Sequence, residues 1–464
     1  MEAPNVFFLS VDSLRYDYFS DFQETIADRT TGVSFTNAVS TATQTSSSMP
    51  MLATGSYTDE LETWGLPESG EPAPLAEVFQ DWGYRTGLWT DNFLFGADYN
   101  YDRGFDGGDL GKPTWKKKLS TTLQNGPIEP LFPAIEWTYF NIFKRFTQSL
   151  GADENFYRPA SSLNESAIDW VTAQTDPTFC WIHYMDPHHP FEPPTDYLGK
   201  YKFNTTENRN ELSQLSRNAI KANGEGYSSA ELDDVKQVYE AACEYQGDQI
   251  LDFIEQLEAS GQYDPNRDVF VLTADHGECL SHDQYGMMGH VPPAIWEESV
   301  RVPLVISIPE WSRETVTRQA TLANLYETIV TAVDFRVDGD SEETLPTPAD
   351  MTAETAHFVT EWEVPGTDET HTYRGVRRAD GTKLFGGHLN AQDQVVLTEY
   401  TVDEISDTIR FTSTGEETPD DSDELELWSA LMELVEERGS AIDDAAVVTG
   451  ELNEEHLRDL GYLD

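Results

Sequence analysis

The sequence predicts an α/β fold, in which helices cover both faces of a largely parallel β-sheet and a smaller antiparallel unit follows towards the C-terminus. Residues 269–272 (VFVL) form a short continuous apolar run, which is typical of a strand buried on both faces. Residues 74–92 combine an amphipathic helix, a glycine stop and a strand, which is the repeating unit of such a sheet. Residues 373–385 and 395–402 are typical of antiparallel strands.

The length of the chain sets its domain organisation. A chain of 464 residues is too long for one simple core, so we expect one large domain with a smaller appendage. An acidic, proline-containing stretch at residues 336–356 marks the connection between them. We therefore expect a main domain over residues 1–340 and a smaller C-terminal subdomain over residues 341–464.

The charge of the chain is strongly one-sided. Acidic residues outnumber basic ones by 84 to 29, which gives a formal net charge of -55 and a pI near 4.2. Such a charge repels nucleic acid, and its self-repulsion is tolerable mainly where salt screens it. We therefore expect a halophilic host, a cytoplasmic location and no nucleic-acid partner. The three cysteines lack metal-site spacing and agree with a reducing compartment. Only four residues precede the first apolar run, so no signal peptide is expected.

Two strand ends carry candidate metal ligands. The apolar run at residues 5–11 ends at Asp12, and the run at residues 269–272 leads to Asp275 and His276. Ligands of open α/β sheets bind beyond the carboxyl ends of the strands. Carboxylates beside an imidazole suit a divalent metal ion, so these three residues are candidate ligands. The alternative for Asp12 is that it caps the next helix.

A Ser/Thr-rich loop at residues 36–50 enters a predicted helix. Thr45 lies near the N-terminus of this helix, where free N–H groups and the helix dipole favour an anion or an oxyanion. The residues alone favour the simpler interpretation, in which the loop supplies a helix cap without chemistry.

The segment at residues 112–150 differs from the rest of the chain because it holds six of the 29 basic residues. Aromatic and aliphatic residues recur within it at helical spacing, which predicts an amphipathic helix. Core packing is the usual role of such a helix. The alternative is a peripheral membrane contact through residues 131–150, or a lid over an apolar substrate.

Histidines gather in the second half of the predicted main domain. A strand at residues 178–185 runs into a proline-rich loop with His188 and His189, and six of the ten histidines lie between residues 183 and 290. His290 is a further candidate ligand or acid. Residues 196–229 are polar and are expected to form a surface excursion, whereas residues 230–260 predict a long amphipathic helix.

Seven motifs span nearly the whole chain: PNVFFLSVDSLRYD, LAEVFQDWGYRTGLWTDN, RGFD, HYMDPHHPFEPP, TADHGE, GH before WEESVRVPLVISIP, and HLRDLGYLD. In this order they resemble the sulfatases of the alkaline-phosphatase superfamily. The resemblance implies a large mixed, mostly parallel sheet between helices, with a small C-terminal antiparallel sheet. By position, the resemblance implies that Asp12, Asp275 and His276 bind a divalent ion, which would be calcium, manganese, magnesium or zinc. It also implies that His188 and His290 either contact the substrate anion or donate a proton to its leaving group.

Two departures from the family pattern bear on function. Sulfatases carry a Cys-x-Pro-x-Arg signature whose Cys, or Ser in some members, becomes formylglycine. The register of the LATG run (residues 52–55) places Thr45 at the nucleophile position, with Ser47 and Met49 where the family has Pro and Arg. Thr45 thus resembles the threonine nucleophile of phosphodiesterase and phosphoglycerol-transferase relatives. Ser13 stands where many sulfatases have a second Asp ligand, which implies a poorer or single-metal site.

These residues lead to one main hypothesis and two alternatives. A formylglycine hydrate expels sulfate by collapsing to an aldehyde, whereas a threonine ester must be attacked at its central atom, which phosphorus permits more readily than sulfur. The main hypothesis is therefore a metal-dependent hydrolase or transferase of phosphate esters or phosphodiesters with Thr45 as nucleophile. Its substrate would be a small-molecule, glycan-linked or lipid-linked ester. The alternatives are a sulfatase and a non-catalytic binding protein that retains the fold.

Overall fold

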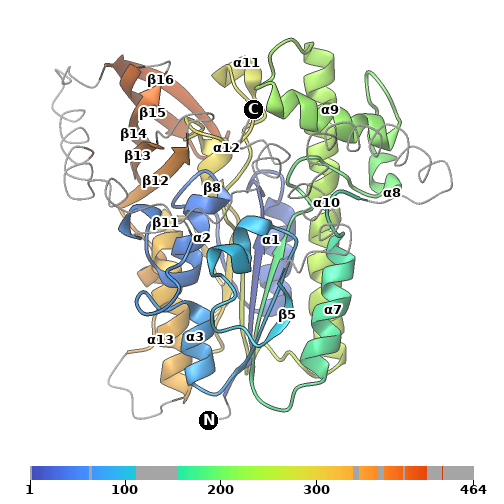
Figure 1. Ribbon diagram of the computed structural model, residues 1–464, viewed down its shortest axis with the longest axis vertical. Coiled ribbons are helices and arrows are strands. Elements are labelled where there is room, and N and C mark those ends of the chain that lie inside the picture. Colours follow the sequence, from blue (N-terminus) through green and yellow to red (C-terminus); the bar gives the residue numbers. More distant parts are fainter. Residues whose placement is uncertain are drawn as a thin grey trace, which may run out of the picture.

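A central β-sheet between two layers of helices forms the main body of the protein (Figure 1). The computed structural model describes residues 3–61, 65–110, 155–337, 344–363, 370–389, 392–414 and 431. The predicted helix and membrane contact at residues 131–150 lie outside these residues, as do the boundary at residue 340 and nearly all of the chain beyond residue 414.

The central sheet has eight strands in the order β10-β2-β9-β7-β1-β6-β4-β5. Only β9 runs antiparallel to its neighbours among these described strands, so the sheet is mixed and mostly parallel, as expected. Its strands are β1 (Val6–Val11), β2 (Val33–Phe35), β4 (Arg85–Thr90), β5 (Gly107–Leu110), β6 (Thr178–Tyr184), β7 (Val269–Ala274), β9 (Leu304–Ser307) and β10 (Thr315–Val316).

The three central strands are buried along their whole length, which explains their continuous apolar sequences. β1 pairs in parallel with β6 on one side and with β7 on the other. The register aligns Val11 with Tyr184 and with Ala274. All three strands therefore end at the same level, and the polar residues that follow them meet at one edge of the sheet.

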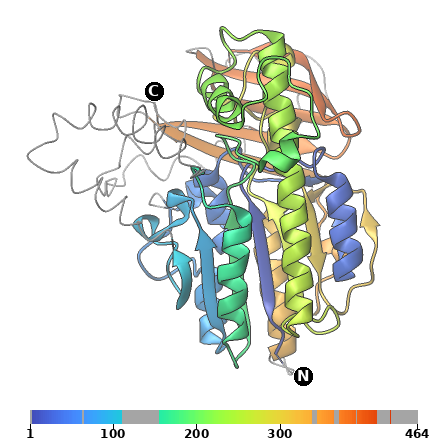
Figure 2. The same ribbon diagram turned by 90° about the vertical axis from the view of Figure 1, so that its right-hand side faces the viewer.

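Helices cover both faces of this sheet. The views of Figures 1 and 2 place α1, α10 and α7 side by side on one face and α2, α3 and α13 on the other. The helices are α1 (Ser20–Thr30), α2 (Thr45–Thr54), α3 (Leu75–Asp81), α7 (Ala160–Thr172), α8 (Thr195–Leu198), α9 (Arg209–Lys221), α10 (Ser229–Ala259), α11 (His282–Tyr285), α12 (Glu297–Val300) and α13 (Leu325–Val337).

A second, antiparallel sheet follows the main body in sequence and confirms the small C-terminal sheet that was expected. Its strands, in spatial order, are β12 (Thr355–Glu363), β13 (Thr370–Arg378), β14 (Thr382–Leu389), β15 (Gln392–Thr401) and β16 (Ser406–Ser413). A three-stranded sheet of β11 (Ala320–Thr321), β3 (Ala38–Val39) and β8 (Arg301–Val302) completes the described strands.

A fully buried charged cluster joins the C-terminal sheet to the main body. Glu297 of α12 accepts hydrogen bonds from Arg377 Nε at 2.9 Å and Arg377 Nη2 at 2.8 Å. Lys383 Nζ lies 3.1 Å from Glu297 Oε1 and 2.6 Å from Asp407 Oδ1. Long side chains of this kind are rarely buried unless paired, and the sequence pattern of residues 373–385 did not indicate their burial.

Two segments differ from their sequence predictions. The apolar run at residues 302–308 is typical of one strand, but Pro303 separates β8 from β9, because proline cannot donate to a ladder. Residues 196–229 were expected as a polar excursion, but they contain the short helix α8 and the helix α9. α9 is amphipathic, but most of its residues are polar and only a few apolar ones, such as Leu212 and Ile220, anchor it to the core, so its low mean hydropathy obscured the helix.

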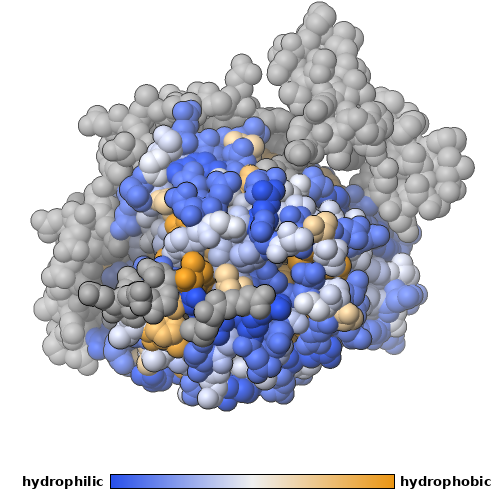
Figure 3. All heavy atoms as spheres, turned by 90° about the horizontal axis from the view of Figure 1, so that it is seen from below, coloured by the Kyte–Doolittle hydropathy of each residue, from blue (hydrophilic) through white to orange (hydrophobic). Residues whose placement is uncertain are grey.

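The described surface is largely polar. The end of the molecule that Figure 3 shows is mostly hydrophilic with small apolar patches. Among the described residues, Val337 and Ile409 are the large hydrophobic side chains that are exposed. The described helices include none that is long and apolar enough to cross a membrane.

Candidate active site

Asp12, Asp275 and His276 meet at the carboxyl ends of β1 and β7. The parallel register places Asp12 and Asp275 directly after paired residues, so their side chains are neighbours. His276 Nε2 lies 3.5 Å from Asp275 Oδ2 and 3.9 Å from Asp12 Oδ1. One ligand atom from each residue falls within 4.8 Å of the others, and all three side chains are buried.

Backbone groups hold this trio in place. His276 Nδ1 donates to the carbonyl of Gly277 at 2.8 Å, which leaves Nε2 facing the two carboxylates. Asp275 Oδ1 accepts from the N–H groups of Ser13 at 3.2 Å and His276 at 2.8 Å. Gly277 is required by close packing, because a Cβ there would lie 2.1 Å from the carbonyl oxygen of Glu298.

The two carboxylates form an electrostatically unbalanced pair. Burial, together with the neighbouring Asp12, raises the pKa of Asp275 to about 8. Burial alone would raise the pKa of Asp12 as well, but the surrounding histidines, above all His188, hold it well below its usual range. Neither aspartate forms an ion pair with a lysine or arginine in the part of the chain that the structure describes.

The residues present fit a divalent cation. Asp275 Oδ2 is buried without a hydrogen-bond partner among the described residues. A cation between the carboxylates would satisfy this oxygen and offset their mutual repulsion. Two carboxylates and one imidazole form a donor set that suits several divalent ions.

Thr45 is the first residue of α2 and points into this trio. Its Oγ1 donates to Asp12 Oδ2 at 3.2 Å and lies 3.4 Å from His276 Nε2. The hydroxyl is completely buried. Its hydrogen bond goes to Asp12 rather than to the first turn of the helix, and Gln44 at the N-cap makes no side-chain capping bond. A simple capping role for Thr45 is therefore absent from this arrangement.

The C-terminal sheet holds the segment that carries Thr45. β12 is an edge strand, and its outward N–H groups bind the chain at residues 41–47. Val359 N donates to Thr41 O at 2.9 Å, and Glu361 N donates to Ser47 Oγ at 3.2 Å. The side-chain amide of Gln44 donates to the carbonyl of Glu361. The C-terminal sheet thus positions Thr45, the candidate nucleophile, beside the edge of the central sheet.

Asn92 and His183, which the sequence analysis did not single out, also contact Asp12. Asn92, which follows β4, donates from Nδ2 to Asp12 Oδ2 at 2.9 Å. His183 on β6 places Nε2 3.5 Å from the same oxygen, while its Nδ1 is hydrogen-bonded to Ser10 at 2.9 Å. The position of Asn92 at a strand end was the available signal, since β4 lies beside β6 in the sheet.

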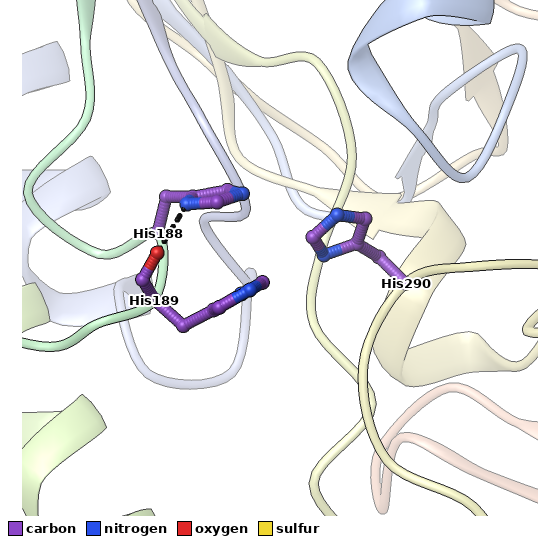
Figure 4. A group of neighbouring side chains, drawn as sticks. All are labelled: His188, His189 and His290. Atoms are coloured by element: carbon purple, nitrogen blue, oxygen red, sulfur yellow. Dashed lines mark hydrogen bonds between the residues drawn. The ribbon is translucent and has the colours of Figure 1, made fainter. Parts of the chain in front are cut away.

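A second buried cluster, which we call the histidine cluster, consists of His188, His189 and His290 (Figure 4). The rings of His188 and His189 stack with centroids 4.4 Å apart, and His290 faces both from the opposite side. The His290 ring lies 4.6 Å from that of His276, so the cluster borders the Asp12 site. Glu278 accepts from His290 Nδ1 at 3.1 Å.

Burial keeps these histidines neutral at pH 7. It lowers the pKa of His188 to about 4 and the pKa values of His189 and His290 to about 3. Burial also raises the pKa of Glu278. A bound anion would raise the pKa values of these histidines again.

The structure brings all six predicted site residues into one buried region: Asp12, Thr45, His188, Asp275, His276 and His290. The chemical role of each remains a prediction.

Comparison with known proteins identifies the family. The family model described as Sulfatase matches residues 4–335, which is most of the chain. The chain belongs to the sulfatase family. It is 24% identical over 331 residues to the uncharacterised sulfatase YidJ of Escherichia coli K12, an alignment that covers 66% of this chain and 61% of that protein. The match therefore spans less than two thirds of the length of that relative.

Solved structures share the fold of this sulfatase-family chain. The phosphonate monoester hydrolase of Agrobacterium radiobacter superposes with a TM-score of 0.61 at 17% identity, covering 94% of this chain and 95% of that one. BT4656, solved with its substrate D-glucosamine-2-N,6-O-disulfate, gives a TM-score of 0.61 at 15% identity, covering 96% and 99%. At these identities the likeness shows the alkaline-phosphatase-like fold.

The departures from the sulfatase signature have structural counterparts. Met49, at the position of the signature arginine, is buried in the core, and Ser47, at that of the proline, binds β12. Ser13, at the position of the second Asp, directs Oγ to Asp12 Oδ1 at 2.8 Å. Its backbone has φ 60, a left-handed conformation that is uncommon for serine.

Proposed function

We propose that this sulfatase-family protein is a metal-dependent hydrolase or transferase of phosphate esters or phosphodiesters that uses Thr45 as its nucleophile. The observation that carries the proposal is the place of Thr45 Oγ1, 3.2 Å from Asp12 and 3.4 Å from His276, two of the three candidate metal ligands. This hydroxyl is buried, and its hydrogen bond goes to Asp12 rather than to the first turn of α2. Its position suits a nucleophile better than a helix cap.

Asp12, Asp275 and His276 would hold the metal ion. When bound, a divalent ion would supply positive charge that lowers the pKa of the Thr45 hydroxyl and offsets the charge of the substrate. Asp12 Oδ2 accepts a hydrogen bond from this hydroxyl, so it orients Oγ1 and is placed to take its proton as a general base. The N-terminal dipole of α2 favours negative charge at the same point.

His188 and His290 are the residues that we propose to receive the substrate anion or to protonate its leaving group. Both are buried beside the trio, and the rings of His276 and His290 are 4.6 Å apart. Because both are neutral at pH 7, a general-acid role requires the bound anion to raise their pKa. Direct ligation of the anion or of a further cation requires no such change.

Threonine favours phosphorus over sulfur as the central atom. An ester of Thr45 cannot collapse to an aldehyde, so water or an acceptor alcohol must attack the central atom to release the enzyme. Phosphorus accepts such an attack more readily than sulfur does. A sulfatase remains the second candidate, because BT4656 shares this fold and acts on a sulfated sugar. The intact donor set argues against the third candidate, a non-catalytic binding protein.

The substrate is proposed to be a small-molecule, glycan-linked or lipid-linked ester, and the working environment to be saline. The net charge of -55 supports the second part of this proposal, since salt must screen the acidic surface. A cytoplasmic location stays a prediction.

A substrate panel and a trapping experiment test the proposal. The protein is assayed at high salt with Mn²⁺ or Zn²⁺ on an aryl sulfate, a phosphate monoester, a phosphodiester and a phosphonate monoester. We expect turnover of a phosphorus ester to exceed that of the sulfate. Thr45→Ala should abolish turnover, whereas the control Ser48→Ala should retain it, because the buried Ser48 hydroxyl has no hydrogen-bond partner in the described structure.

Mass spectrometry locates the nucleophile. We expect a phosphorylated intermediate in the intact mass of the wild type under trapping conditions, with fragmentation placing the group on Thr45. Full activity of Thr45→Ala, or an adduct on another residue, would contradict the mechanism. A preference for the aryl sulfate would favour the sulfatase alternative.

A further inference from the structure

We propose that His188, His189 and His290 form a second divalent-cation site, which takes a zinc-like ion beside the site of Asp12, Asp275 and His276. This inference deepens the proposed function, on which it rests for the identity of the site. It does not require Thr45 to be the nucleophile. The ion would receive the substrate anion in place of direct histidine contacts.

The geometry of the histidine cluster fits a single ion. One ring nitrogen from each residue lies within 4.8 Å of the other two, and each of the three residues is at most 1% exposed. Figure 4 shows the stacked rings of His188 and His189 pointing towards His290 across a gap. Three imidazoles that converge in this way form the protein part of a tetrahedral zinc site.

Hydrogen bonds orient two of the rings as ligands. His188 Nδ1 lies 2.6 Å from the carbonyl of His189, which can only accept, so this nitrogen carries the proton and Nε2 carries a lone pair. His290 Nδ1 faces both oxygens of Glu278, at 3.1 and 3.2 Å. Metal-binding histidines typically donate their other ring N–H to a carbonyl or a carboxylate in this way.

His189 is the residue that a packing explanation does not account for. Both of its ring nitrogens are buried without a hydrogen-bond partner among the described residues, and Glu278 Oε2 is 3.8 Å from Nδ1. Burying a polar ring without partners is unfavourable. A cation at the centre of the cluster would bind one of these nitrogens.

The charge of Glu278 points the same way. This carboxylate is fully buried, and its ion-pair contacts among the described residues are to His189 and His290, with none to a lysine or arginine. Arg15, the nearby cation, binds the backbone carbonyl of Glu278 and pairs with Glu298 instead. A divalent ion held by the histidines would offset the buried charge of Glu278.

The donor atoms distinguish the two sites. The Asp12 site offers mainly oxygen, which magnesium and manganese accept, whereas the histidine cluster offers nitrogen, which zinc and cobalt prefer. The adjacency of His276 and His290 places the two sites close enough to bind one substrate together, as in two-metal phosphatases.

Metal stoichiometry of the full chain tests the proposal without an activity readout. Protein freed of metal by chelation is saturated with Zn²⁺, desalted and analysed by mass spectrometry for metal content. We expect about two Zn²⁺ ions per chain for the wild type and about one for His189→Ala, with Asp275→Ala also binding about one. Mg²⁺ should fill only the Asp12 site. Co²⁺ should give visible absorption typical of nitrogen ligands, and His189→Ala should lose it.

Controls keep the result interpretable. His282→Ala alters a histidine of α11 outside the cluster and should retain both ions. His189→Gln provides a second variant of similar volume, and the melting transition shows that each variant is folded. One Zn²⁺ per wild-type chain, or an unchanged stoichiometry in both folded His189 variants, would overturn the second site. If Asp275→Ala keeps both ions, that result would instead contradict the metal site of the proposed function.

Discussion

Ser47 Oγ accepts a hydrogen bond from the backbone N–H of Glu361 at 3.2 Å, although the two residues are 314 positions apart in the chain. Ser47 belongs to the first turn of α2, the helix that begins at Thr45, and Glu361 belongs to the edge strand of the C-terminal sheet. This bond, with that between Val359 and Thr41, fixes the candidate nucleophile to a second structural unit.

Removing the Ser47 hydroxyl should therefore affect both stability and catalysis. Ser47→Ala leaves the buried N–H of Glu361 without this acceptor, so we expect a loss of about 1–2 kcal/mol in the free energy of unfolding. We also expect a lower kcat with the metal content unchanged, because α2 loses one of its attachments. Ser48→Ala is the matched control, since the hydroxyl of Ser48 has no hydrogen-bond partner in the described structure. Equal stability and activity of the two variants would show that this bond does not position Thr45.

The carboxylates of Asp12 and Asp275 should destabilise the metal-free protein. At a pH above about 8, where Asp275 is ionised, Asp275→Asn removes one of two buried, adjacent negative charges. We therefore expect the free energy of unfolding of the chelated variant to exceed that of the chelated wild type by about 0.5–2 kcal/mol at this pH. Mn²⁺ should raise the Tm of the wild type but not that of the variant. The comparison is made by thermal melts with and without Mn²⁺.

Asp268→Asn serves as the control for that substitution. Asp268 is buried but already paired, with Arg267 Nη2 2.7 Å from its Oδ2, so its replacement should lower stability. A chelated Asp275→Asn protein that is less stable than the wild type, or that still responds to Mn²⁺, would show that the two aspartates do not form a cation site.

The buried Glu297 cluster should make the attachment of the C-terminal sheet sensitive to acid. Burial alone would raise the pKa of Glu297, but Arg377 and Lys383 outweigh burial and lower it to about 2. A carboxyl whose folded-state pKa is depressed contributes stability at pH values above its unfolded pKa, near 4.5, and this contribution is lost as the pH falls towards 2. Asp407 has the opposite shift, because burial raises its pKa despite the contact with Lys383.

Glu297→Gln should therefore cost about 3–5 kcal/mol at pH 7, since it leaves buried cations without their partner. The difference in unfolding free energy between the variant and the wild type should shrink between pH 4.5 and 2. Glu258→Gln breaks an exposed pair with Arg29 and should cost less than about 1 kcal/mol. A pH-independent difference would indicate that Glu297 is not ionised in the folded protein.

Low salt should destabilise the whole protein. With 84 acidic and 29 basic residues, self-repulsion is screened within about 3 Å at 1 M salt but extends over about 10 Å at 0.1 M. We expect the Tm to rise steadily with KCl up to molar concentrations, and an equal concentration of a neutral osmolyte to have a smaller effect. An unchanged midpoint between dilute buffer and molar KCl would remove the basis for a halophilic host.

Local sequence pattern was sufficient for much of the fold. The apolar run at residues 269–272 lies in β7, and the amphipathic pattern at residues 230–260 corresponds to α10 within one residue at each end. The pattern failed at two segments. Polar residues obscured α9, and the apolar run at residues 302–308 concealed the break at Pro303.

The sequence by itself determined which residues stand at the ends of the central strands, and hence that Asp12, Asp275 and His276 would meet, because parallel strands of a twisted sheet end at a common edge. Only the tertiary structure decided what surrounds them. Asn92 binds Asp12, the ring nitrogens of His189 have no hydrogen-bond partner among the described residues, and β12 packs against the turn of Ser47. Hydrophobic periodicity is a local property that places a residue on a strand or a helix. The contacts that orient and charge the site join segments distant in sequence, and their pairing depends on how the whole chain packs.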